Sequence, residues 1–509
     1  MKNILLRMFL MLLVIATVSV AFVGCDNSKD SGKNDDTTES TEETTDDGGD
    51  ESESENTSEI LEVPESVNFA DGEKKAAVNV LSWDCFFTEF DVDSITGVEV
   101  DDAVFYRDEN ISERLGVVME YTPQNGRHNT YSQYKAYVEN SVNGGGDAYD
   151  LIACYVRSAA ACASGGLLME LTTIEDSWLD TEKAWWNKNL IKQVSVQDSL
   201  FYVTGDASTS FVQMIYCIYF NQEMMVDRGL TSPYDLVANN EWTLANMMAL
   251  SEFFYEDLND NKKVDLGDML PTAGQYFDWP AVLHGCGIGY VVKDADGNFV
   301  LNPELYGEKG RGIMDDLRDW VDLEGALSLP ADQVPMINAF MEEQVMFLQT
   351  QSGCAARYFK DIEFEYACVP MPKYDSKQEE YISTVDQKMT MFCMPKNVPS
   401  DRIEMATATL ECWGYEGYVT TTPIIFDVVM SYQKSTSQNM TDMLILIRDT
   451  AWFDLARIHA PEVGICDKPG QHLYANGDNW NTYLNNNVET LTAKVDKLNT
   501  DLMEAAGLN

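Results

Sequence analysis

Short apolar runs alternate with longer amphipathic segments along most of this chain. The runs at 74–83, 117–121 and 149–155 have the length and apolar character of buried strands, and the segments at 103–115 and 131–143 predict helices. Strands that alternate with helices at this spacing are typical of an α/β sheet covered on both faces. Because ligands of such sheets bind at the carboxyl ends of the strands, the residues directly after each strand are site candidates.

The pattern continues toward the C-terminus. Small residues at 158–166 predict another helix, and 200–204 predicts another strand. The last segment has apolar residues at alternating spacings of three and four, which predicts an amphipathic helix laid on the second of two lobes. These apolar residues are Val488, Leu491, Val495, Leu498 and Leu502.

The N-terminus has the order of an export signal. Lys2 and Arg7 precede an apolar run at 9–23, and Gly24 precedes Cys25. The four residues that end at Cys25 resemble the lipobox of bacterial lipoproteins, although Phe22 stands where leucine is usual. An ordinary signal peptide with an incidental cysteine is the alternative. Residues 1–24 are therefore predicted to be a signal peptide and Cys25 the lipid-modified residue, which places the body on the extracellular face of the membrane, attached only through lipid.

An acidic tract follows the leader. Residues 26–59 contain 14 acidic residues, two lysines and almost no apolar side chains. Such a segment cannot bury enough surface to offset the entropy of ordering, and its charges repel one another. We expect residues 25–70 to be the lipid anchor and a disordered linker.

Net charge limits the classes of partner, and cysteine spacing indicates the state of the thiols. A formal net charge of -50 excludes a nucleic-acid partner, which needs clustered Lys and Arg, and it favours a neutral ligand. The ten cysteines after Cys25 form no CxxC pair, and several lie within apolar runs, so buried free thiols are expected.

About 435 residues follow the linker, which is more than one hydrophobic core supports, so two lobes are expected. Within them, Tyr-Asp-Leu-Ile at 149–152 and Ala-Ser-Gly-Gly-Leu-Leu-Met-Glu-Leu at 163–171 resemble the family 1 extracellular solute-binding proteins, the ligand receptors of ABC importers. Five later segments resemble the clostridial branch of that family in the same order: Trp185-Trp186-Asn187, Leu200-Phe201-Tyr202 into Gly205-Asp206, Ile218-Tyr219-Phe220-Asn221 leading to Gly229-Leu230, Glu241-Trp242-Thr243 and Val369-Pro370-Met371-Pro372.

The resemblance implies an α/β fold of two lobes, the type II periplasmic-binding-protein-like fold, with a ligand cleft between lobes joined by hinge crossovers. The N-terminal lobe would comprise 71–204 plus 384–425, and the C-terminal lobe 205–383 plus 426–509. Crossovers are expected near 202–210, 383–390 and 413–426. The resemblance also implies a monomer that hands its ligand to an ABC importer permease, with no catalysis and no catalytic cofactor.

A carbohydrate site needs aromatic platforms beside carboxylates, amides and arginine, because sugars present apolar faces and hydroxyl rims. The aromatic candidates are Trp83, Tyr155, Trp279, Trp413 and Trp452, and the polar candidates are Asp84, Arg157, Asp206 and Asp278. Trp185 and Trp186 are adjacent and point two ways, so at least one of them is expected to pack in the core.

A second local signal lies between 257 and 268. Oxygen-bearing side chains occupy loop positions 1, 3, 5, 9 and 12, as in EF-hand and dockerin calcium loops: Asp257, Asn259, Asn261, Asp265 and Asp268. Lys262 replaces the usual turn glycine, and Asp268 is shorter than the usual glutamate. A structural calcium ion is the prediction, and a solvated acidic loop is the alternative.

Sequence motifs for catalysis are absent. The four histidines are isolated, and no HExxH, GxSxG or P-loop spacing occurs. We therefore expect a lipid-anchored receptor that captures a neutral oligosaccharide by lobe closure. A receptor for peptides or other small solutes, and a surface glycoside hydrolase, are the alternatives.

Overall fold

The folded body begins near residue 60. The computed structural model describes residues 60–145, 148–275, 278–329, 333–431, 438–474 and 480–508, so the predicted leader and Cys25 lie outside the described residues. Leu61 and Val63 are buried, and the Phe69 N–H donates to the Leu115 carbonyl at 2.8 Å. Residues 60–70, which the sequence pattern assigned to the linker, thus include side chains and backbone that pack within the described body.

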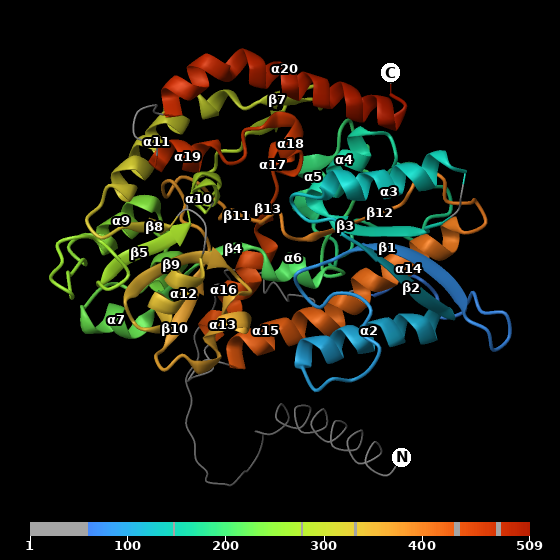
Figure 1. The fold of residues 1–509 in the computed structure, drawn as a ribbon, viewed down its shortest axis with the longest axis horizontal. Helices are drawn as coiled ribbons and strands as arrows, with labels where there is room; N and C mark the ends of the chain where they lie inside the picture. The colour runs from blue at the N-terminus through green and yellow to red at the C-terminus, as the bar shows by residue number, and fades with distance from the viewer. Residues whose placement is uncertain are drawn as a thin grey trace, which may run out of the picture. The chain divides into compact units, whose positions relative to one another are not determined.

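The first sheet has the strand order β12-β3-β1-β2 (Figure 1). Its strands are β1 (Ala76–Trp83), β2 (Val117–Gln124), β3 (Leu151–Tyr155) and β12 (Thr390–Cys393). β1 is parallel to β2 and β3, and β12 is antiparallel to β3, with Thr390 opposite Tyr155. The helices of this half are α2 (Glu99–Leu115), α3 (Tyr131–Asn143), α4 (Val156–Ser164) and α14 (Ile403–Glu416).

The second sheet has the order β10-β4-β9-β5-β8. Its strands are β4 (Tyr216–Asn221), β5 (Leu270–Gln275), β8 (Leu327–Leu329), β9 (Val345–Gln351) and β10 (Tyr366–Val369). β4 is antiparallel to β9 and β10, whereas β5 is parallel to β8 and β9. Helices that follow in this half are α7 (Gln222–Asp227), α8 (Pro233–Ala238), α9 (Leu244–Ser251), α10 (Trp279–Gly285), α11 (Glu308–Val321), α12 (Val334–Met341), α13 (Cys354–Tyr358) and α16 (Gln438–Asp449).

Most predicted elements are present within a few residues of their expected bounds. The strands of the first sheet lie in 71–204 and 384–425, and those of the second sheet lie in 205–383. The segment 200–204 is an exception, because it forms a single bridge from Val203 to Phe392 instead of a strand. The ten cysteines that the structure describes are free and nine of them are buried, which confirms the expectation of buried thiols.

Two antiparallel segments connect the sheets. The outgoing segment, 203–216, contains α6 (Thr209–Gln213), and the returning segment is 385–392. Bridges between Val203 and Phe392 and between Ile215 and Val385 hold them side by side. A third connection is helical: α14 continues through a π-helical turn at Gly417–Thr421 into α15 (Thr422–Ser431).

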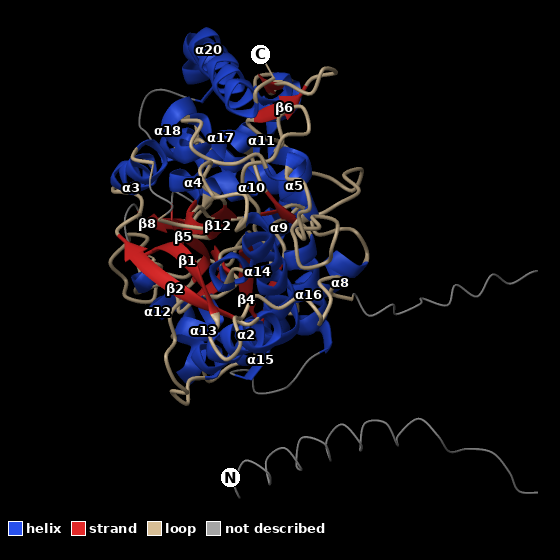
Figure 2. Cartoon of the chain, turned by 90° about the vertical axis from the view of Figure 1, so that its right-hand side faces the viewer, coloured by secondary structure: helices blue, strands red, loops and turns tan. Residues whose placement is uncertain are grey.

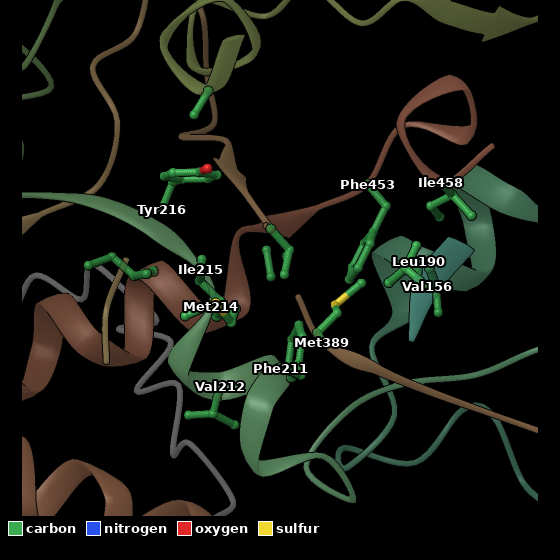
Figure 3. Close-up of a cluster of buried hydrophobic side chains, with 14 of the residues drawn as sticks. Val156, Leu190, Phe211, Val212, Met214, Ile215, Tyr216, Met389, Phe453 and Ile458 are labelled. Atoms are coloured by element: carbon green, nitrogen blue, oxygen red, sulfur yellow. The ribbon is translucent and has the colours of Figure 1, made fainter. Parts of the chain in front are cut away.

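Apolar side chains from distant parts of the chain surround these connections. Figure 3 shows Phe211 of the outgoing segment, Met389 of the returning segment and Phe453 together, with Val156 and Leu190 beside them. The rings of Phe211 and Phe453 are stacked, with 6.1 Å between centroids. The crossover region is therefore a packed core and not an exposed linker.

The C-terminal helix reaches both halves. α20 (Trp480–Ala506) contacts α4 of the first half and the hairpin of β6 (Val291–Lys293) and β7 (Phe299–Leu301) at its β7 strand. Figure 1 shows α20 along one edge of the molecule, above α17 (Leu455–Ile458), α18 (Ala460–Val463) and α19 (Lys468–Tyr474), and Figure 2 shows it above α17 and α18. The predicted amphipathic helix is confirmed, with Leu491, Val495, Leu498 and Leu502 buried, but it packs on both halves and not on the second alone.

Candidate functional site

A pocket of about 550 Å³ has walls from both sheets. Tyr155 is the last residue of β3, and Gln275 is the last residue of β5. Tyr216 begins β4 and pairs with Gln351, the last residue of β9, because these two strands are antiparallel. The pocket thus lies at the carboxyl ends of strands, as expected for ligand sites in α/β sheets. Its lining residues are Phe86, His128, Tyr155, Arg157, Tyr216, Gln275, Gln333, Val334, Asp386, Gln387, Lys388, Arg457, Cys466 and Asp467.

The predicted residues Tyr155 and Arg157 both lie on the pocket wall. The Trp83 ring packs behind Tyr155, with 5.4 Å between centroids, which fixes the tyrosine ring. Arg157 donates from Nε and Nη2 to Gln387 Oε1 at 2.8 and 2.5 Å. A fixed aromatic ring and a positioned guanidinium therefore stand two residues apart at the end of one strand.

The returning segment supplies a carboxylate to the pocket, that of Asp386. Tyr216 donates its hydroxyl to Asp386 Oδ2 at 2.7 Å, and the Lys388 N–H donates to Asp386 Oδ1 at 2.9 Å. Burial alone would raise the pKa of Asp386, but the charge of Lys388 and the Tyr216 hydrogen bond hold that pKa below its ordinary value. Asp386 is thus an ionised carboxylate whose two oxygens already accept hydrogen bonds.

The predicted residue Asp278 lies beneath this wall. Its Oδ2 accepts the Gln275 N–H at 2.7 Å, and its Oδ1 is buried with no hydrogen-bond partner among the described residues. Burial raises the pKa of Asp278 to about 7, an effect that the Gln275 N–H partly opposes. Asp278 therefore holds the end of β5 that carries the pocket residue Gln275.

Asp84 and Trp83 lie beside the pocket but do not line it. Asp84 pairs with Arg127 at 2.9 Å and accepts the Gly126 N–H at 3.0 Å, and the Arg127 guanidinium covers the ring of the pocket residue Phe86. Trp83 is 1 % exposed and donates its Nε1–H to Thr390 Oγ1 at 2.8 Å. The structure thus makes Trp83 a support for Tyr155 instead of a platform for ligand.

The other predicted tryptophans lie elsewhere. Trp279 and Trp413 are core residues: Trp279 packs on Trp320 with 4.8 Å between centroids, and Trp413 packs on Phe392 with 5.0 Å between centroids. Trp452 packs on His284, with 5.0 Å between centroids. Each of these large rings fills space between elements, and none of the three lines the pocket.

Asp206 also has a structural position. It forms a buried ion pair with Arg448 of α16, and Thr422 donates its hydroxyl to Asp206 Oδ1 at 2.6 Å. Trp185 and Trp186, of which at least one was expected to pack in the core, lie nearby and are both buried. Asp206 therefore ties the outgoing crossover to α15 and α16 and does not line the pocket.

Sequence reasoning missed most of the polar lining. Asp386, Gln387 and Lys388 lie within the crossover that was predicted at 383–390, so the expected position of the hinge beside the ligand was the available signal. Gln275 was signalled only by its place three residues before Asp278. Arg457 gave no local signal, because it lies in a short helix that reaches the pocket only through the tertiary fold.

The predicted calcium loop is held by its own side chains. Asn261 Nδ2 donates to Asp265 Oδ2 at 2.6 Å, Asn259 Nδ2 donates to Asp268 Oδ1 at 3.3 Å, and the Lys262 N–H donates to Asp257 at 2.8 Å. Across the described parts of the chain, no group of three or more His, Cys, Asp or Glu residues has an arrangement that could hold a metal ion. The calcium site stays a prediction.

The two covered sheets, their paired crossovers and the pocket between strand ends define a mixed α/β fold of the periplasmic-binding-protein kind, which confirms the predicted fold class. The cyclic α-maltosyl-1,6-maltose binding protein from Arthrobacter globiformis matches with a TM-score of 0.53 and 12% identity, over 85% of this chain and 99% of that chain. UspC from M. tuberculosis matches with a TM-score of 0.51 and 14% identity, over 82% of this chain and 100% of that chain. A cyclo/maltodextrin-binding protein complexed with maltotetraose matches with a TM-score of 0.50 and 12% identity, over 84% and 96%.

Other comparisons add no relatives. No family model matches the chain, and no curated protein matches it. The clostridial assignment therefore stays a prediction. In the described part of the chain, every helix is too short or too polar to cross a bilayer.

Proposed function

We propose that this protein is the substrate-binding component of an ABC importer and that it captures an oligosaccharide without altering it. The observation that carries the proposal is the pocket itself, in which three aromatic rings, three glutamines and charged side chains meet at the strand ends of two sheets. Such a mixture suits the apolar faces and hydroxyl rims of a sugar. Two fold neighbours, a cyclo/maltodextrin-binding protein and a cyclic α-maltosyl-1,6-maltose binding protein, support the same class of ligand.

The proposal includes attachment to the outer face of the cell membrane through a lipid on Cys25, with delivery of ligand to the permease. The order of basic, apolar and small residues before Cys25 supports this attachment. We also retain the prediction of a monomer that approaches the membrane only through its lipid.

Calorimetry against a panel of oligosaccharides, paired with an assay for new reducing ends, tests the function. Binding that saturates without release of reducing ends is the expected result. Release of reducing ends would identify a glycoside hydrolase, and binding of peptides alone would identify a receptor of another class.

Tyr155→Ala should weaken binding of the sugar identified in this way by about tenfold or more, because it removes the fixed aromatic face of the pocket. Tyr155→Phe keeps the ring and should stay within about fivefold of the native affinity. Tyr137→Ala is the control, since Tyr137 is an exposed aromatic on α3. Equal affinities of Tyr155→Ala and the native protein would contradict the assigned pocket.

We further propose that the loop at 257–268 binds calcium, supported by the spacing of its five oxygen-bearing side chains. Calcium at about 100 times its dissociation constant should stabilise the fold by about 2.7 kcal/mol, seen as a higher melting temperature than in chelator. Asp265→Asn should abolish this shift, whereas Asp260→Asn, outside the five positions, should preserve it. An unchanged melting temperature of the native protein in millimolar calcium would leave the loop as a solvated acidic turn.

A further inference from the structure

Arg457 is a buried cation that forms no close ion pair with a described carboxylate. It lies in α17, lines the pocket and is 6 % exposed. Its Nε is buried without a hydrogen-bond partner, and its guanidinium forms no ion pair within the described parts of the chain. A buried charge is costly to the fold unless it is paired, so this arrangement points to a partner supplied from the pocket.

The carboxylates around Arg457 are engaged elsewhere. Asp454 accepts the Ala456 and Arg457 N–H groups at Oδ1, at 2.8 and 3.2 Å, and the Tyr290 and Val291 N–H groups at Oδ2, at 2.7 and 3.3 Å. Asp386 accepts hydrogen bonds at both oxygens from Tyr216 and Lys388. Burial acts to raise the pKa of Asp386 and of Asp454 and the charge of Arg457 acts to lower it, but neither carboxylate forms an ion pair with the Arg457 guanidinium.

The pocket also reverses the charge of the chain locally. Three basic side chains line it, from Arg157, Lys388 and Arg457, against two carboxylates, from Asp386 and Asp467. The whole chain carries a formal net charge of -50. A local excess of positive charge inside so acidic a protein favours an anionic group on the ligand.

Resting on the proposed function, we infer that the captured oligosaccharide carries a carboxylate, as uronic-acid sugars do, and that the Arg457 guanidinium binds this group. The two N–H groups on one edge of an arginine match the two oxygens of a carboxylate, which gives a bidentate pair. The neighbouring Arg157, whose guanidinium is positioned by Gln387, would donate hydrogen bonds to the hydroxyl groups of the sugar. This inference replaces the expectation of a neutral ligand that the total charge suggested.

Calorimetry with trisaccharides of galacturonate, glucuronate and mannuronate, each beside its methyl ester, tests the inference. The ester keeps the sugar and removes the charge. For the trisaccharide that binds, we expect the ester to bind at least about tenfold more weakly, and Arg457→Met to abolish this preference. Neutral glucose, galactose and mannose trisaccharides are measured in the same series.

Each other outcome has a distinct meaning. A neutral trisaccharide that binds more tightly than every acid overturns the inference and leaves the proposed function standing. Absence of binding by acids, esters and neutral sugars alike overturns both. Equal affinities of an acid and its ester overturn the carboxylate pairing alone.

The stability of the ligand-free protein gives a second readout. Arg457→Met keeps the unbranched stem and removes the unpaired charge, so the melting temperature should rise by about 2 °C or more. Arg107→Met is the matched control, because Arg107 is fully buried but paired with Asp108 at 2.8 Å. The melting temperature of the Arg107→Met variant should fall, because Asp108 loses its partner. A fall for Arg457→Met would show that Arg457 already has a structural partner and would overturn the inference.

Discussion

Asp206→Ala should lower the free energy of unfolding by about 3 to 5 kcal/mol, because it leaves the Arg448 guanidinium without its buried counter-ion. Asp206 is 1 % exposed, and Arg448 also donates from Nη2 to the Ala184 carbonyl at 3.3 Å. The substitution removes the acceptor of the Thr422 hydroxyl as well. Urea unfolding followed by circular dichroism measures the loss.

Asp449→Ala is the matched control for this pair. Asp449 binds the other side of the same guanidinium, with Nη1 to Oδ1 at 2.9 Å, but its side chain is 56 % exposed. An exposed ion pair contributes about 0 to 1 kcal/mol, so Asp449→Ala should lie within that range. Equal losses for the two variants would contradict a buried structural role for Asp206.

Glu411→Ala should cost about 3 to 5 kcal/mol of unfolding free energy. Glu411 of α14 accepts Trp185 Nε1–H at 3.1 Å, Trp186 Nε1–H at 2.9 Å and the Asp180 N–H at 3.1 Å. Both indoles are buried, and a buried donor left without an acceptor costs about 1 to 3 kcal/mol. Chemical denaturation of the variant beside the native protein checks the value.

The same helix offers a control. Glu404 of α14 accepts the Trp178 Nε1–H at 3.4 Å, but Glu404 is exposed, so water can replace it after Glu404→Ala. This variant should stay within about 0.5 kcal/mol of the native stability. A loss comparable to that of Glu411→Ala would mean that burial does not set the difference.

The sequence pattern was informative where local residues decide the structure. The apolar runs predicted β1, β2 and β3, and the rule that ligands bind after strands favoured Tyr155 and Arg157, which both line the pocket. The apolar pattern failed at 200–204, which it predicted to be a strand. There the chain makes one bridge to Phe392 and then turns at Gly205 against the Trp185 backbone. The local periodicity of apolar residues cannot predict pairing with a segment nearly 190 residues away.

The aromatic candidates show a second limit. α14 is buried almost all round, so the spacing of its residues gives no outward face, and Trp413 could not be assigned to core or pocket from the pattern. Asp386 and Arg457 reach the pocket through the pairing of two crossovers and the placing of a four-residue helix. Their roles depend on the assembled tertiary structure.

The C-terminal helix α20 limits how the two halves can move apart. It is one continuous element of 27 residues, about 40 Å long, that contacts α4 on one side and β7 on the other. A helix of this kind does not lengthen, so a movement that preserves both contacts has to turn about the edge where α20 lies. The pocket would then widen on the side remote from that edge, by a hinge rotation of the two halves.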